Sequence, residues 1–324
     1  MEVIQDFTTI DPVFRGAVLA IGNFDGVHRG HKQVIDVARE RADYFGVPVG
    51  VLTFEPHPQE FFRPEKASFR LTPLEAKARI MHRIGVDVLF AAPFNQGMAS
   101  TSPQHFIDSV LLRDLATIHV VAGYDFHFGH KRAGDPAVLA YMGEMEGLGV
   151  TIVDRVVDDG DPARTNSSTE IRDFLRGGKP KDAARLLGHP WFIEQRVEAG
   201  DARGRGLGFP TANLSLSGLV EPAHGVYAVR VTLPGPAAYQ PGQVVEGIAN
   251  LGPQPTFGSD EVRLEAFLFD FEGDLYGKHL TVELIDYVRP VQKFDGPDAL
   301  KAQIAKDIET ARAQLAAATG DPLH

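Results

Sequence analysis

Along the first half of the chain, short apolar runs alternate with segments in which apolar residues recur at helical spacing. The runs at residues 17–22, 48–54, 86–94, 119–126 and 150–157 are flanked by turn residues, which predicts strands. The clearest helical segment follows His31 and ends at Gly46, a residue suited to terminate a helix. Its apolar face carries Val34, Ala38, Ala42 and Phe45. Strands and helices in alternation predict a doubly wound parallel sheet.

The second half has a different pattern, in which strand-like segments follow one another directly. They span residues 192–197, 225–233, 244–251, 264–271 and 280–288. Such a series predicts a small β-barrel or a sandwich. Within residues 298–318, the spacing predicts a terminal helix with an apolar face of Leu300, Ile304, Ile308 and Leu315. We therefore predict an α/β domain over residues 1–187 and a β domain with a terminal helix over residues 188–324.

Composition and charge exclude several classes of protein. At 324 residues the chain is longer than most single hydrophobic cores, which agrees with two domains. It has no cysteine, so a disulfide framework and a thiol nucleophile are excluded. A net charge of −11 has the wrong sign for nonspecific nucleic-acid binding. Since no segment resembles a signal peptide or a membrane span, we expect a cytoplasmic protein with neither nucleic acid nor membrane as partner.

Residues 22–31, GNFDGVHRGH, lie where the first predicted strand gives way to the first predicted helix. Gly22, Gly26 and Gly30 allow a tight turn and a close backbone approach to a ligand. The start of the helix presents N–H groups and the positive end of its dipole, which stabilise a phosphate. His28 and His31 can both face that phosphate and donate hydrogen bonds to it.

Two other interpretations of these histidines compete with phosphate binding. They can be solvent-exposed loop residues, which is the usual state of a lone histidine. They can also be zinc ligands, but no third candidate ligand lies at a spacing typical of zinc sites. The strand, the glycine turn and the helix together favour phosphate binding.

GNFDGVHRGH resembles the HxGH motif of nucleotidyltransferases, in the form found in bifunctional riboflavin kinase/FAD synthetases. Four further segments resemble successive motifs of the adenylyltransferase module: TFEPHP at 53–58, LTPLEAK at 71–77, VAGYDFHFGHKRAGD at 121–135 and SSTEIRDFLRGG at 167–178. GDARGRGLGFPTANL at 200–214 is similar to the kinase module's motif, and GIANLGPQPTFG and FEGDLYG continue it. The resemblance implies that ATP and Mg²⁺ are used to convert riboflavin to FMN and FMN to FAD, with release of pyrophosphate.

For the adenylyltransferase module, the resemblance implies a nucleotidyltransferase fold in which His28 and His31 stabilise charge on the reacting phosphate. The ATP and phosphate contacts would come from Gly22, Asn23, Gly30, Ser167, Ser168, Thr169 and Arg172. Serine and threonine at 167–169 can cap the next helix while Arg172 reaches the departing pyrophosphate. A plain helix cap is the simpler interpretation, and the same residues can both cap the helix and contact phosphate. Asp125 and Phe128 resemble the wall that contacts flavin or adenine.

For the kinase module, the resemblance makes Glu265 the base that accepts the proton of the riboflavin hydroxyl. Strand alternation places Glu265 on one face with Phe267 and Phe269, although an ordinary strand glutamate is the simpler interpretation. Thr211 and Asn213 can complete a magnesium site with ATP phosphates, or they can organise a turn. Gly208 is a further expected phosphate contact.

The sequence departs from the family pattern at two points. Asn166 stands before SST where an apolar residue is usual, and Gln195 and Arg196 stand where a glycine is usual. Two other functions compete with the bifunctional enzyme: an enzyme with one working module, and a nonenzymatic flavin-binding regulator that acts on nucleic acid. The retained Glu265, Thr211 and His28 oppose the first function, and the net negative charge opposes the second.

Overall fold

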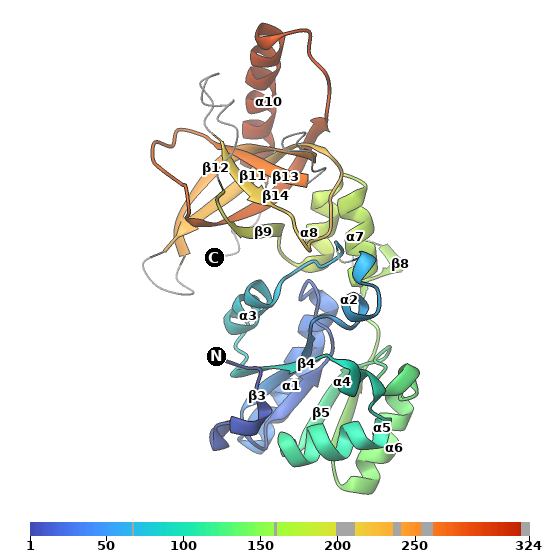
Figure 1. Cartoon of the computed structure of the whole chain (residues 1–324). Coiled ribbons are helices and arrows are strands. Elements are labelled where there is room, and N and C mark those ends of the chain that lie inside the picture. The colour runs from blue at the N-terminus through green and yellow to red at the C-terminus, as the bar shows by residue number, and fades with distance from the viewer. Residues whose placement is uncertain (67, 159–160, 199–210, 236–240, 254–261, 319–324) are drawn as a thin grey trace. The chain divides into compact units, whose positions relative to one another are not determined.

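Buried apolar runs form the strands of two separate cores. The computed structural model describes residues 1–66, 68–158, 161–198, 211–235, 241–253 and 262–318 (Figure 1). They divide into two compact units, the first from residues 1–67 and 72–166 and the second from residues 68–71 and 167–324.

The first unit contains a six-stranded sheet among its described residues, with the order β1-β4-β3-β2-β5-β6. Every neighbouring pair is parallel. Its strands are β1 (Glu2–Ile4), β2 (Val18–Ile21), β3 (Val49–Glu55), β4 (Val88–Pro93), β5 (His119–Gly123) and β6 (Gly149–Val153). A short antiparallel pair, β7 (Val157–Asp158) and β8 (Asp161–Thr165), follows. The predicted parallel sheet is confirmed.

The boundaries differ from the prediction in a few places. β1 was not predicted, because a three-residue strand gives almost no periodicity. β5 ends at Gly123, where a turn closed by the Phe126 N–H on the Gly123 carbonyl replaces the expected continuation. β6 ends at Val153, and Val157 belongs to the β7–β8 pair instead.

The helices of the first unit connect these strands. They are α1 (Arg29–Phe45), α2 (Pro58–Phe62), α3 (Leu74–Arg83), α4 (Gln96–Ser100), α5 (Pro103–His105), the π-helix η4 (Phe106–Asp114) and α6 (Pro136–Glu146). Short 3₁₀ segments lie at η1 (Phe7–Thr9), η2 (Pro12–Phe14), η3 (Pro64–Lys66) and η5 (His130–Arg132). α1 buries Val34, Ala38 and Ala42 as predicted, and Gly46 ends it at a φ of 68°. Phe45, expected on the buried face, is 46% exposed because it lies in the last turn.

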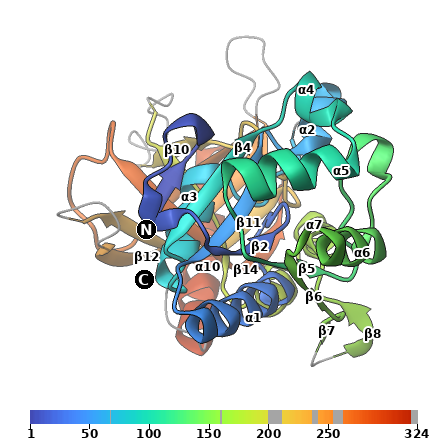
Figure 2. The ribbon, with the colours of Figure 1, turned by 90° about the horizontal axis from the view of Figure 1, so that it is seen from below.

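The two faces of the sheet are covered by different helices. Figure 2 shows α1 on one side of the strands and the α5–η4 helix on the other. On the η4 side, Phe106, Ile107 and Leu111 pack with alternate strand residues such as Leu19 and Phe90. This is the doubly wound arrangement, and the strand order reverses between β2 and β5. Ligands of such sheets bind beyond the carboxyl ends of the strands at this reversal, where β2 leads into α1.

The second unit contains a six-stranded antiparallel sheet among its described residues, with the order β10-β13-β12-β11-β14-β9. Its strands are β9 (Trp191–Arg196), β10 (Ala212–Ser215), β11 (Gly225–Pro234), β12 (Pro241–Pro253), β13 (Val262–Leu268) and β14 (His279–Pro290). Glu198, just after β9, bridges Asn213 of β10, and this brings the two edge strands together. The predicted barrel is thus confirmed, and it is nearly closed. The short strand β10 was not among the predicted strands.

Among its described residues, the second unit contains the helices α7 (Ser168–Arg176), α8 (Pro180–Leu187) and α10 (Pro297–Ala317). Residues of α7 and α8 share one core with the barrel strands. The domain boundary after residue 187 stays a prediction. α10 packs beside β11, β12 and β14 through Ala311 and Leu315 (Figure 1), which confirms the terminal helix. No helix of the described residues is both long and apolar enough to cross a membrane.

A buried ion pair fixes α10 to the barrel. The Arg289 guanidinium on β14 donates to both carboxylate oxygens of Asp307, at 2.9 Å from Nε to each and 2.7 Å from Nη2 to Oδ2. Gln303 donates to the same carboxylate at 2.8 Å. Asp307 is 3% exposed, so these donors replace the water that its carboxylate loses on burial.

Replacing Arg289 by methionine should therefore destabilise the second unit by about 3 kcal/mol, because it leaves a buried carboxylate without its cation. Denaturant unfolding followed by the fluorescence of Trp191, the chain's only tryptophan, measures this unit. The control is Arg176→Met, which removes the exposed 3.6 Å pair with Asp173 and should cost about 0.5 kcal/mol or less. Equal effects of the two substitutions would contradict this account.

Candidate functional site

The turn from β2 into α1 is built from backbone conformations that most residues avoid. Phe24 and Val27 have positive φ angles of 50° and 42°, and Gly26 has a φ of 90°. Phe24 is 1% exposed and Val27 is fully buried. Positive φ in a bulky or branched residue is strained, so the surrounding contacts must hold this turn in place.

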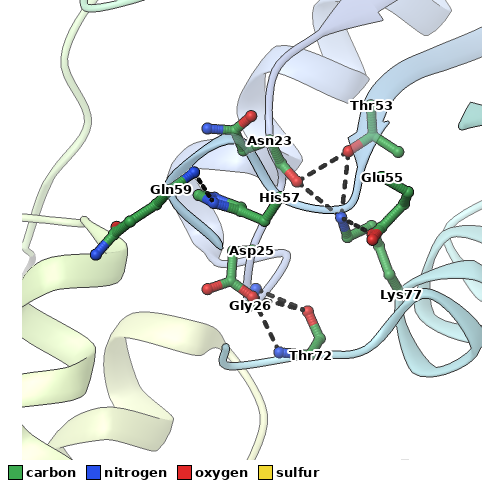
Figure 3. Close-up of polar contacts among 9 residues, drawn as sticks. All are labelled: Asn23, Asp25, Gly26, Thr53, Glu55, His57, Gln59, Thr72 and Lys77. Carbon is green, nitrogen blue, oxygen red and sulfur yellow. Dashed lines mark hydrogen bonds and ion pairs between the residues drawn. The ribbon is translucent and has the colours of Figure 1, made fainter. Parts of the chain in front are cut away.

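A buried lysine on α3 supplies the first of these contacts (Figure 3). The Lys77 ammonium donates to the Asn23 carbonyl at 2.9 Å, to the Thr53 hydroxyl at 3.2 Å and to the Glu55 carboxylate at 3.4 Å. Thr53 also donates to the Asn23 carbonyl, at 3.0 Å. Lys77 is 2% exposed. The ammonium therefore ties the turn to the end of β3, a role that the sequence pattern around Lys77 does not reveal.

Thr72 supplies the second contact, on the other side of the turn (Figure 3). Its backbone N–H donates to Asp25 Oδ1 at 3.0 Å, and its hydroxyl accepts from the Gly26 N–H at 2.9 Å. Both Thr72 and Asp25 are buried. These bonds satisfy the polar groups of the turn, which would otherwise be costly to bury.

The two histidines stand at the start of α1. His28 is the N-cap, and its Nδ1 accepts the His31 N–H at 3.3 Å. Since Nδ1 is the acceptor, the neutral ring carries its hydrogen on Nε2. The two imidazoles stack, with ring centroids 3.6 Å apart and planes 16° from parallel. His28 is 6% exposed, so it is not the solvent-exposed loop histidine considered above.

Gly30 leaves the space that this arrangement requires. A Cβ placed on Gly30 would lie 3.1 Å from His28 Cε1 and 3.2 Å from the Asn166 carbonyl oxygen. Gly22 is similarly close to the Phe24 ring, at 3.3 Å. Asn166, the unusual residue before SST, is 7% exposed and donates through Nδ2 to the Val157 carbonyl at 2.9 Å.

Cations gather on the first turns of α1. Burial lowers the pKa of the Lys32 ammonium below its usual range, and the charges of Arg29 and Arg83 lower it further. In a chain with a net charge of −11, this positive region adds to the helix dipole beside His31. The electrostatics at the start of α1 therefore favour an anion.

Aromatic side chains form a second feature of the first unit. Phe61 and Phe62 of α2 contact Phe94, with ring centroids 5.4 and 5.8 Å from it. Phe62 is 62% exposed, so it offers a ring to a planar ligand. Phe128 is 6% exposed and stacks on Phe126 at 5.6 Å, within the core of this unit. Asp125 lies on the exposed loop after β5.

The serine-rich segment and its arginine belong to the second unit. Ser167 caps α7 by accepting the Glu170 N–H at 3.3 Å, and Ser168 and Thr169 open that helix. The plain helix cap is therefore present. Arg172 donates through Nε to the Phe69 carbonyl at 2.7 Å. Contact of these residues with ATP stays a prediction.

The residues expected in the kinase module meet on neighbouring strands. Glu265 of β13 stands directly opposite Asn213 of β10. Asn213 is 4% exposed, and its Oδ1 accepts no hydrogen bond from the described residues. Thr211 is exposed and lies just before β10. Gly208 lies outside the described residues.

The fold and the site together define a two-module transferase of phosphate-containing groups. The first unit has a parallel sheet whose β2–α1 turn suits a nucleotide phosphate, and the second is a β-barrel with a carboxylate beside a buried amide. The FAD synthetase family model matches residues 11–169, and the riboflavin kinase model matches residues 187–315. The chain belongs to the bifunctional riboflavin kinase/FMN adenylyltransferase family. It phosphorylates riboflavin to FMN and adenylylates FMN to FAD, with ATP as co-substrate.

Named relatives agree with this assignment along nearly the whole chain. Bifunctional riboflavin kinase/FMN adenylyltransferases from Pseudomonas fluorescens and Escherichia coli K12 are each 41% identical to it, over 98% and 92% of both chains, respectively. A crystal structure described as a macrolide-efflux protein from Streptococcus pneumoniae is similar, with a TM-score of 0.82 and 32% sequence identity. The match covers 96% of this chain and 98% of the Streptococcus pneumoniae chain. The family resemblance and the two activities are confirmed.

Proposed function

We propose that the β2–α1 turn carries out adenylyl transfer to FMN through His28 and His31. The phosphate of FMN is largely ionised at neutral pH, since the second pKa of such a monoester is about 6. It can attack the α-phosphorus of ATP without a base, so the enzyme must supply position and charge. The observation that carries this proposal is the cap bond: Nδ1 of His28 accepts the His31 N–H, which fixes the His28 ring at the start of α1, where the helix dipole and N–H groups favour a phosphate.

The other expected contacts of this step complete the proposal. Gly22, Asn23 and Gly30 would contact ATP through the turn, and Ser167, Ser168, Thr169 and Arg172 would contact its phosphates. Asp125 and Phe128 would line the flavin or adenine, and the exposed ring of Phe62 extends the candidate flavin wall.

Replacement of Phe62 by alanine should raise KM for FMN if this ring stacks on the flavin.

We infer that Glu265 is the base of the kinase step. The riboflavin hydroxyl is neutral, so its attack on the γ-phosphorus of ATP benefits from a positioned proton acceptor. Glu265 is half-buried on the barrel strand β13, beside Asn213. Thr211, Asn213 and Gly208 would contact the phosphates of ATP.

Magnesium is the metal that we propose for the kinase step. The buried Asn213 Oδ1, which has no donor among the described residues, is an oxygen of the kind that Mg²⁺ accepts. Thr211 would add a hydroxyl, while ATP phosphates and water complete the shell. When bound, the ion neutralises charge on the phosphates.

The cytoplasm is the compartment that we propose. The chain has no cysteine, which fits a reducing environment.

His28→Ala should lower FAD formation from FMN by about 10²-fold or more, while FMN formation from riboflavin continues. Glu265→Ala should lower FMN formation by about 10²-fold or more and spare FAD formation. Each step is assayed separately by chromatography of the flavins. His82→Ala and Glu309→Ala, both at exposed helix positions, are the controls. If either site substitution struck both reactions equally, the proposed division would be wrong.

Asn213→Ala should raise the Mg²⁺ concentration needed for half-maximal kinase activity by about tenfold, as the loss of a weak ligand does. The Mg²⁺ dependence of the adenylyl step on the same preparation is the internal control and should not change. An unchanged kinase titration, or an equal shift in both steps, would refute Asn213 as the metal contact.

A further inference from the structure

Asn166 is a buried polar residue to which the proposed adenylyl step gives no role. It lies between β8 and α7 and is 7% exposed. Its backbone N–H donates to the Val156 carbonyl at 3.1 Å, and its side-chain Nδ2 donates to the Val157 carbonyl at 2.9 Å. Both the backbone and the side chain of Asn166 are therefore held by residues at the start of β7.

The bond to Val157 also fixes which way the Asn166 amide is turned. A backbone carbonyl can only accept, so the amide nitrogen must face it, and a flipped amide would bring two oxygens together. The other branch of the amide is then Oδ1, which is buried and accepts no hydrogen bond from the described part of the chain. A buried acceptor without a donor is costly, so this oxygen suits a donor that a ligand brings.

Asn166 borders the β2–α1 turn. A Cβ placed on Gly30 would lie 3.2 Å from the Asn166 carbonyl oxygen and 3.1 Å from Cε1 of His28. Asn166 and the imidazole therefore line the same small space at the start of α1, and both residues belong to the first unit. This is the end of the sheet at which nucleotides bind in doubly wound folds.

The chemistry of an amide oxygen limits what it can bind at this place. It accepts hydrogen bonds and donates none, whereas the ionised phosphate oxygens of ATP are themselves acceptors. The donors of ATP are all in its adenosine part, namely the amino group of adenine and the two hydroxyls of ribose. The apolar residue that is usual in the family at this position could not accept from any of them.

We propose that Oδ1 of Asn166 accepts a hydrogen bond from the adenosine part of ATP in the adenylyl step, which makes Asn166 a determinant of nucleotide specificity. The donor is the adenine amino group or a ribose hydroxyl, which share this chemistry. The inference rests on the proposed role of the β2–α1 turn in adenylyl transfer. Because Nδ2 is bound to the Val157 carbonyl, the acceptor is oriented before ATP binds.

Nucleotide analogues that each lack one donor test this contact. Purine riboside triphosphate lacks the amino group, and 2′-deoxy-ATP and 3′-deoxy-ATP each lack one hydroxyl. The measurement is kcat/KM for each nucleotide in FAD formation at saturating FMN, expressed as the ratio of ATP to analogue. For one analogue this ratio should be about tenfold smaller in Asn166→Leu than in the wild type, because only the wild type leaves a buried oxygen unpaired with that analogue. The ratios for the other two analogues should not change.

The ratios separate nucleotide binding from a structural effect of the substitution. Loss of the bond to Val157 in Asn166→Leu would slow all nucleotides alike and leave every ratio unchanged. Gln33→Leu also exchanges an amide for an apolar group, at an exposed position of α1, and should keep the wild-type ratios. The rate of FMN formation from riboflavin should stay at the wild-type value in each variant, which reports an intact preparation.

The outcomes distinguish this inference from the proposal on which it depends. If His28→Ala forms FAD at the wild-type rate, the proposed adenylyl site is wrong and the role of Asn166 fails with it. If His28→Ala is impaired while Asn166→Leu keeps all three wild-type ratios, only the inference is overturned. Equal changes in all three ratios would also overturn it, because one hydrogen bond accounts for discrimination against one analogue only.

Discussion

The ammonium of Lys77, buried beneath the β2–α1 turn, is the contact on which the geometry of the first unit's site depends. Two non-glycine residues of that turn have positive φ angles, and such a backbone persists only when its surroundings hold it. Lys77 binds the Asn23 carbonyl and connects it to Thr53 and Glu55. The turn then delivers His28 to the N-cap of α1, where anions are favoured.

The second unit meets a different chemical demand with a different scaffold. A neutral hydroxyl needs a proton acceptor, and the antiparallel barrel provides a carboxylate whose neighbours are set by strand register. Glu265 and Asn213 are adjacent because β10 and β13 pair, although 51 residues lie between them along the chain. Register fixes such pairs firmly, since slipping a strand by one residue would turn every side chain to the other face.

The sequence predicted those features that local pattern encodes. Strands such as β3 and β11 are continuous apolar runs, and His28 and Gly30 belong to a recognisable motif. The role of Lys77 was missed because a lysine in an amphipathic helix usually lies in solvent, and only the packing of α3 under the turn buries it. The direct pairing of Asn213 with Glu265 could not be predicted from local pattern, because strand register is a tertiary property.

The most direct test of the account is chromatographic analysis of the flavins made from riboflavin, ATP and Mg²⁺ by Gly30→Ala beside Gly46→Ala. Gly30 lies inside α1, where alanine favours the helix, but its Cβ would press on His28. Gly46 ends the same helix with open space around it, and alanine at its positive φ costs about 1–2 kcal/mol of strain without contact to His28. We predict that Gly30→Ala accumulates FMN, with FAD formation about 10²-fold slower, while Gly46→Ala continues to FAD. Normal FAD formation by Gly30→Ala, or loss of FMN formation as well, would contradict the account.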